Sequence, residues 1–226
     1  MDAIHANSRA MSPVPVPLPV RSTYRHGDLR RALLEAGIAL ARSGGPEAVV
    51  LREVTRQAGV VPNAAYRHFG SRQELLKAVR AAALSASAAA MEAELAAVPA
   101  DLPPADAARA ALRAIGTGYL RFAQAENGLF RTAYAASDDL AGPGDPARAG
   151  PSGKNPFQLL GEALDQMVAA GVMPAARRPG AEFLAWSAVH GLAMLVLDGP
   201  LGPVVGPQMQ QVGQRLLDMV EHGLSV

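Results

Sequence analysis

The 226-residue chain has no cysteine, few aromatic residues and no long hydrophobic run. Without cysteine it has no disulfide framework, no thiolate metal site and no thiol nucleophile, which fits a reducing compartment. No stretch reaches the roughly 18 consecutive apolar residues that a membrane-spanning helix needs. The stretch MSPVPVPLPV also lacks the cationic leader of a secretion signal. We therefore expect a cytoplasmic protein that does not enter a membrane.

Positive charge is concentrated in one part of the chain. Residues 21–80 hold eleven basic and five acidic residues, a balance of +6, whereas the remainder holds ten basic and fifteen acidic residues, a balance of −5. A basic segment joined to an acidic body is typical of proteins that bring one part to a polyanion. Arginines scattered over exposed helices would give the same balance without a partner. Charge alone therefore admits nucleic acid as a partner and does not establish it.

Helical periodicity interrupted by proline and glycine runs through most of the sequence, and no strand pattern of convincing length occurs. Residues 1–22 alternate proline with small aliphatic residues, which is typical of a disordered, polyproline-like tail. The segment 137–156 holds four glycines and four prolines and indicates a flexible loop. The chain is therefore predicted to be all-α, with about nine helices in two domains, 23–82 and 83–226.

The basic segment contains two short predicted helices, about 50–59 and 62–69. Gly59 suits the turn between them, and Pro62 suits a first helical turn, where its missing N–H is not needed. The residues SRQE, 71–74, have capping-box spacing and open the next helix. Two short helices joined by a tight turn, with a third helix behind them, form the layout of a helix-turn-helix DNA reader.

In such a reader the second short helix enters the major groove. The candidate DNA-contacting residues of this unit are Pro62, Asn63, Ala64, Tyr66, Arg67, His68 and Arg72. The first three would face the bases, and the phenol, guanidinium and imidazole groups that follow can reach phosphate oxygens. Taken alone, His68 is an ordinary partly exposed histidine, so its role depends on the layout. The alternative for Tyr66 is that it is mainly a core residue with its hydroxyl group at the rim, which is compatible with a phosphate contact.

Residues 24–80 resemble the amino-terminal domain of the TetR family of transcriptional regulators, above all in AGVVPNAAYRHFGSRQELL, residues 58–76. In the second half, Trp186, His190 and Gly191 are similar to the Trp-His-Gly type of TetR ligand domain. The resemblance implies a homodimer that reads a palindromic operator, acts as a repressor and is released by a small-molecule inducer. It also implies that Arg52 contacts DNA.

Two residues depart from the family pattern. Val50 and Val61 stand where family members commonly carry a capping Ser or Thr, and losing a helix cap typically costs about 1 kcal/mol. We therefore expect a less stable reading head, or caps replaced by water or phosphate. Ala64 offers no hydrogen bond and would read only a thymine methyl group. Base specificity would then rest on Asn63 and Arg52.

Aromatic, histidine and methionine side chains at helical spacing are candidates for an inducer pocket in the second half. They are Tyr119, Phe122, Phe130, Tyr134, Met167, Trp186, His190 and Met194. Such residues are more often plain core, which remains the alternative for each of them. The last two long helices, about 179–197 and 208–222, are too apolar for a monomer surface and are predicted to form the homodimer interface.

Enzymatic function has no support in the sequence. The five histidines show no metal-ligand spacing, no glycine-rich phosphate loop follows a strand, and no Ser-His-acid set can be nominated. We therefore expect no catalytic residue, no metal and no cofactor. The alternative function is a helical interaction protein of the same fold that has lost specific DNA reading, as the changes at Val50 and Val61 would allow.

Overall fold

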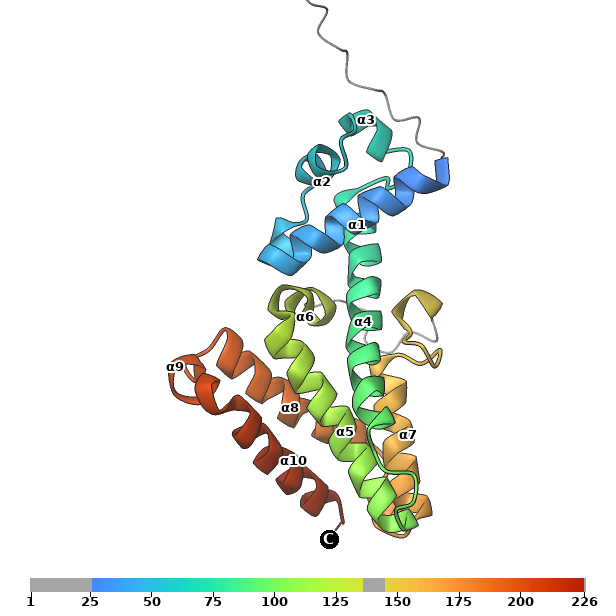
Figure 1. Cartoon of the computed structure of the whole chain (residues 1–226), viewed down its shortest axis with the longest axis vertical. Coiled ribbons are helices and arrows are strands. Elements are labelled where there is room, and N and C mark those ends of the chain that lie inside the picture. Colours follow the sequence, from blue (N-terminus) through green and yellow to red (C-terminus); the bar gives the residue numbers. More distant parts are fainter. Residues whose placement is uncertain (1–25, 136–144, 226) are drawn as a thin grey trace, which may run out of the picture.

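The computed structural model describes residues 26–135 and 145–225, and their regular structure is helical throughout (Figure 1). This confirms the predicted all-α fold with an amino-terminal helix-turn-helix unit and a helical carboxy-terminal part. The predicted disordered tail, 1–22, lies outside the described residues. A short head at one end of the molecule and a larger helical body are connected by one long helix, α4 (Figure 1).

The head consists of α1 (His26–Gly44), α2 (Leu51–Gln57), α3 (Pro62–Ala65) and the first turns of α4 (Arg72–Ala96). Its core is formed by fully buried side chains from all four helices and the segments between them: Leu33, Val49, Val54, Ala65, Phe69, Leu75 and Val79. Burying one such large side chain contributes about 1.5–3 kcal/mol. The arrangement of α2 and α3 therefore depends on α1 and α4 behind them.

Both short helices are shorter than the sequence predicts. α2 ends at Gln57, and α3 ends at Ala65, where the predictions extended to 59 and 69. After α3 the chain turns, and the backbone N–H groups of His68 and Phe69 both donate to the carbonyl oxygen of Ala65, at 2.9 Å each. Phe69, which follows this turn, is fully buried in the head core.

Ser71 begins α4 as predicted, with one difference in the capping pattern. Its hydroxyl oxygen accepts a hydrogen bond from the Glu74 N–H at 3.1 Å. The Glu74 carboxylate reaches back one residue further than a capping box requires and accepts the Gly70 N–H at 2.7 Å. The two bonds join the turn after α3 to the start of the connecting helix.

The body contains six further α-helices within the described residues: α5 (Pro104–Ala125), α6 (Asn127–Tyr134), α7 (Pro156–Ala169), α8 (Ala181–Leu197), α9 (Gly202–Val205) and α10 (Met209–Ser225). α5 is central, since it packs against α4, α6, α7, α8 and α10. At Gly118 a Cβ atom would lie 2.5 Å from the Cα atom of Met91 in α4. Only glycine permits so close an approach of α5 to α4.

Head and body meet where α6 begins beside the end of α1. A Cβ atom at Gly128 would lie 2.2 Å from the carbonyl oxygen of Ala41, so the backbones of α6 and α1 are in direct contact there. Arg42 of α1 donates to the Glu126 carboxylate at 2.8 Å just before α6. The head is thus attached to the body at two places, through α4 and through this α1–α6 contact.

The flexible loop predicted over 137–156 stays a prediction. Its first part lies outside the described residues. In its second part a short 3-10 helix, Pro146–Arg148, packs against α4. There Ser85 donates to the carbonyl oxygen of Ala149 at 2.6 Å, and Ser152 donates to the Glu92 carboxylate at 2.6 Å.

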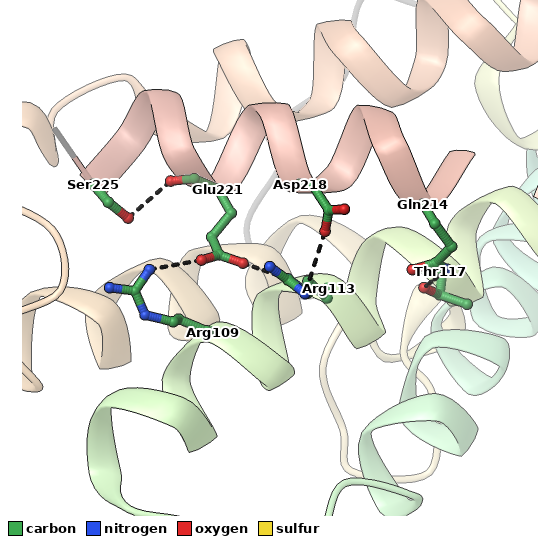
Figure 2. Close-up of polar contacts among 7 residues, drawn as sticks. All are labelled: Arg109, Arg113, Thr117, Gln214, Asp218, Glu221 and Ser225. Carbon is green, nitrogen blue, oxygen red and sulfur yellow. Dashed lines mark hydrogen bonds and ion pairs between the residues drawn. The ribbon is translucent and has the colours of Figure 1, made fainter. Parts of the chain in front are cut away.

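Polar contacts join α10 to α5 at Arg109, Arg113 and Thr117 of α5 (Figure 2). The Glu221 carboxylate, with a side chain only 6% exposed, accepts hydrogen bonds from Arg109 at 2.6 Å and from Arg113. Arg113 also pairs with Asp218 at 3.2 Å. A buried carboxylate held by two guanidinium groups is a contact that helical periodicity could not predict, because it depends on which helix faces α10.

Replacing Glu221 by glutamine should destabilise the body, because one arginine then faces an amide N–H₂ group instead of a carboxylate oxygen. We expect the free energy of unfolding to fall by about 1–3 kcal/mol. Asp218→Asn, at a side chain that is 55% exposed, should cost about 0.5 kcal/mol or less. Urea denaturation at one fixed protein concentration measures both, and equal losses would contradict the special role of Glu221.

Candidate functional site

The turn between α2 and α3 has the geometry of a helix-turn-helix unit. Gly59 has a φ of 69°, a left-handed conformation that L side chains rarely adopt. The following Val60 N–H donates back to the carbonyl oxygen of Thr55 at 3.0 Å and closes the turn. Val54 and Ala65, one from each short helix, are fully buried between them. The chain thereby fixes the outer surface of α3 relative to α2.

Most of the candidate DNA-contacting residues lie on the surface of the head. Arg52, Pro62, Asn63, Tyr66 and Arg67 are exposed, and Ala64, His68 and Arg72 are half-buried. Tyr66 has 54% of its surface exposed, so the alternative that it is a core residue is wrong. The structure thus leaves the start of α3 and the turn after it open to a partner.

Arg72 has an intramolecular role that the sequence did not reveal. Its Nε donates to the carbonyl oxygen of Val49 and its Nη2 to that of Pro46, both at 2.8 Å. These carbonyl groups belong to the segment between α1 and α2. The guanidinium group therefore ties α4 to the entrance of the helix-turn-helix unit, and any phosphate contact by Arg72 would be additional to this role.

The two valines at the helix starts provide no cap. Val50 precedes α2 and Val61 precedes α3, and neither side chain makes a capping hydrogen bond. Both are exposed, at 43% and 69%. The missing caps expected from the sequence are confirmed, and the lower stability of the head stays a prediction.

The body contains a cavity of about 160 Å³ that is partly open to the surface. Its walls come from α4, α5, α6, α7, α8 and α10, with Leu84, Tyr119, Tyr134, Leu160 and Trp186 among the lining residues. Most of this wall is apolar. A concave, mostly apolar site with a few polar groups is the usual form of a small-molecule site.

Three of the predicted pocket residues line the cavity and five do not. Tyr119, Tyr134 and Trp186 are part of its wall. Phe122, Phe130 and Met167 are almost wholly buried in the surrounding core, and His190 and Met194 are half-buried outside the wall. Leu84, Leu160 and the arginines of the wall were missed, because no local pattern distinguishes them from other core or surface residues.

A hydrogen-bonded network of aromatic residues forms one side of the cavity. The Trp186 Nε1–H donates to the Tyr119 hydroxyl oxygen at 3.1 Å, and that hydroxyl group lies 2.7 Å from His190 Nδ1. Burial lowers the pKa of His190, which favours a neutral ring. In that form Nδ1 accepts a hydrogen bond from the Tyr119 hydroxyl group. Burial also raises the pKa of Tyr119 well above its usual value. The network is therefore uncharged at neutral pH.

Phe130 lies behind this network and holds the rings in place. Its ring is 5.3 Å from the ring of Tyr119, 5.0 Å from that of Tyr134 and 5.8 Å from that of His190, measured between centroids. Tyr134 completes the cluster, and its hydroxyl group is hydrogen-bonded to Ser87 at 2.9 Å. Such ring contacts are worth about 0.5–1.5 kcal/mol each beyond their buried area.

Comparison with known families identifies both parts of the chain. Residues 33–79 match the family described as "Bacterial regulatory proteins, tetR family". Residues 112–220 match "Tetracyclin repressor-like, C-terminal domain". No curated protein matches the chain.

Several solved structures share the fold over most of the chain. A protein of unknown function from Rhodococcus sp. RHA1 has 25% identity and a TM-score of 0.70, covering 91% of this chain and all of its own. The TetR family regulator PfmR from Thermus thermophilus has 22% identity and a TM-score of 0.52, covering 86% and 99%. A glutamine-to-alanine variant of TetR from Acinetobacter baumannii AYE, in complex with minocycline, has 16% identity and a TM-score of 0.58, covering 86% and 91%.

A helix-turn-helix head on an all-helical body with an internal cavity defines a class of DNA-binding regulators. Both parts of this chain match models of the same family, over 33–79 and 112–220. The chain belongs to the TetR family of bacterial transcriptional regulators. It is a DNA-binding regulator and not an enzyme, which confirms the prediction. The Trp-His-Gly subtype of the second domain stays a prediction.

Two further findings concern metals and membranes. Within 26–135 and 145–225 no group of three or more His, Asp or Glu side chains is placed to hold a metal ion. No single helix in the same ranges is long and apolar enough to cross a membrane; α8 with the segment Gly202–Ser225 meets the length and composition test only as a pair bent by 97°.

Arg72→Ala should destabilise the head in the absence of DNA, because two backbone carbonyl groups lose their partner. We expect the free energy of unfolding to fall by about 1–3 kcal/mol. Lys77→Ala, at an exposed position of the same helix, serves as the matched control and should leave stability nearly unchanged. Thermal unfolding of the free protein measures both. An unchanged Tm for Arg72→Ala would mean that its hydrogen bonds to Val49 and Pro46 do not stabilise the head, and DNA contact would be its only proposed role.

Proposed function

We propose that this regulator is a ligand-responsive repressor that reads a palindromic operator as a homodimer and is released from DNA by a small-molecule inducer in the cytoplasm. The observation that carries the proposal is the combination, in one chain, of an exposed helix-turn-helix surface and a mostly apolar cavity. The complex of the Acinetobacter baumannii TetR variant with minocycline supports a small-molecule role for the cavity. No membrane partner is part of the proposal.

The proposed DNA contacts divide into two sets. Asn63 and Arg52 would read base edges, and Ala64 would contact a thymine methyl group beside Pro62. Tyr66, Arg67 and His68 would hold phosphate oxygens. All of them lie on or near the open surface of α2, α3 and the following turn. Arg72 would contribute mainly by holding this surface in place.

The proposed homodimer interface consists of the outer faces of α8 and α10. On α8 the residues Leu184, Ala188, Gly191 and Leu195 repeat at helical spacing, and the two leucines are 68% and 46% exposed. On α10 Met219 is 67% exposed. The α10 face that packs on α5 is a different one, with Met209, Gly213 and Leu217. Met219 is therefore available to a second copy.

The domains proposed from the sequence, 23–82 and 83–226, meet in the middle of α4. Leu75 and Val79 of α4 belong to the head core, while Leu84 and Met91 of the same helix line the cavity. A ligand that displaces Leu84 and Met91 would also move Leu75 and Val79 in the head, because an α-helix of this length moves largely as a rigid body. Ligand binding would thus favour a spacing of the two heads that does not fit the operator.

The first experiment is selection of binding sites from random duplex DNA by the purified protein. We expect a two-fold symmetric site that the Tyr66→Ala, Arg67→Ala double variant fails to enrich. Arg67→Ala alone should weaken binding evenly across sequences, and Asn63→Ala should relax the preference at one base pair, a change of about 1–3 kcal/mol. The reverse pattern would exchange the proposed roles of the two residues.

Salt dependence separates this proposal from the alternative of an interaction protein that no longer reads specific DNA. A homodimer that neutralises several phosphates should lose about 10³-fold or more in affinity between 50 and 200 mM salt. A folded dimer that enriches no palindrome and shows no such salt dependence would favour the alternative.

Leu184→Glu should convert the homodimer into monomers, because it places two charges in an apolar interface. Val61→Glu is the matched control, since it introduces the same charge at an equally exposed valine, 69% against 68%, in the head. Sedimentation velocity at micromolar concentration measures the effect. A dimer that survives Leu184→Glu would move the interface away from α8.

A further inference from the structure

The chemistry of the cavity wall indicates what kind of molecule it accepts, an inference that rests on the proposed function of the cavity as a ligand site. The wall carries polar side chains from several elements: Arg80, Arg113, Tyr119, Tyr134, Arg148 and Asn155. Whether these groups are available to a ligand decides between a charged and an uncharged occupant, because a buried charge or hydrogen-bonding group needs a partner.

The hydroxyl groups of the wall are engaged with neighbouring side chains. The Tyr119 hydroxyl accepts from Trp186 at 3.1 Å and faces His190 Nδ1 at 2.7 Å. The Tyr134 hydroxyl is bonded to Ser87 at 2.9 Å. The Trp186 N–H is used in the same network. What these three residues present to the cavity is therefore ring carbon, the surface on which another ring packs well.

The cationic groups of the wall are engaged as well. Arg113 is held by Glu221 and Asp218 of α10, and the Arg80 Nε donates to the carbonyl oxygen of Ala133 at 3.0 Å. The Arg148 Nε lies 3.7 Å from the Asp145 carboxylate, and its side chain is only 13% exposed. No side chain lining the described cavity wall is acidic. Each of these arginines therefore already has a partner, with which an anionic ligand would compete.

Asn155 completes the polar set and is also committed. Its side-chain oxygen accepts the Gln158 N–H at 2.9 Å as the cap of α7, and its own backbone N–H donates to the Gln158 side-chain oxygen at 2.9 Å. Disturbing this residue would open the capping box at the start of a helix that lines the cavity. A ligand that takes over the side-chain oxygen of Asn155 would cost the helix about 1 kcal/mol in capping.

The volume of the cavity fits about one aromatic ring. An engineered apolar cavity of about 150 Å³ is known to hold benzene, and this one measures about 160 Å³. Drug-sized ligands occupy sites of about 300 Å³ or more. From the juxtaposition of the Tyr119, Tyr134 and Trp186 rings with polar side chains that already have partners within the protein, we infer that the cavity binds a small, uncharged, apolar aromatic molecule of about one ring.

Three probes that differ only in one group test the inference: ethylbenzene, phenylacetate and benzylamine. Each is a phenyl ring with one CH₂ group that carries a methyl, carboxylate or ammonium group. Trp186 is the single tryptophan of the chain and lines the cavity, so its fluorescence reports the occupant directly. We expect ethylbenzene to bind at least about tenfold more tightly than either charged probe, because the charged groups lose water without gaining a partner.

Three variants connect the signal to the cavity. Ala185→Leu fills space in the wall and should abolish the response, while Ala93→Leu, at an exposed position of α4 outside the wall, should keep it. Tyr134→Phe should also keep ethylbenzene binding, since the hydroxyl group faces Ser87. Circular dichroism shows whether each variant is folded. If Ala185→Leu alone fails to fold, the Tyr134→Phe variant and the comparison of the three probes still test the inference.

The outcomes separate this inference from the proposed function. Tighter binding of phenylacetate or benzylamine would overturn the uncharged class, and no response to any of the three probes by the folded protein would overturn the one-ring class. Operator binding by the same samples, measured without probe, tests DNA reading independently. If the protein binds a palindromic operator but does not bind ethylbenzene, the proposed DNA reading stands and the inferred ligand class is wrong.

Discussion

The rest of the structure depends on one helix being buried by two different cores. The first turns of α4 place Leu75 and Val79 in the head, and its later turns place Ala88 and Met91 in the body. The glycine at 118 lets α5 approach α4 at backbone distance. Because the interior is close-packed, a displacement of α4 in the body has to be accommodated in the head. This physical link is what a ligand-responsive DNA reader requires.

The body combines an apolar cavity with polar contacts that are fully paired around it. Glu221 holds two arginines, one of which forms part of the cavity wall, and the tyrosine hydroxyl groups are bonded to Trp186, His190 and Ser87. Among the described residues no buried side-chain nitrogen or oxygen atom is left without a hydrogen-bond partner. Paired groups of this kind fix the positions of α5, α8 and α10 and leave the interior surface itself apolar.

The element pattern and the head were predictable because their signals are local. The turn at Gly59, the proline at the start of α3 and the cap at Ser71 each act within a few residues of sequence. The cavity was only partly predictable. Tyr119, Tyr134 and Trp186 were identified as candidates, but Phe130 and Met167, equally good by their spacing, belong to the solid core, since their burial depends on which helices surround them.

By itself the sequence determined the all-helical fold, the helix-turn-helix unit and the family, because periodicity, caps and turns are encoded over short distances. Tertiary structure alone decided that Arg72 holds backbone carbonyl groups, that Glu221 is buried between two arginines and that the polar groups of the cavity wall are already engaged. These are contacts between residues up to 112 positions apart. Which distant groups meet is set by helix packing, and packing depends on all the helices at once.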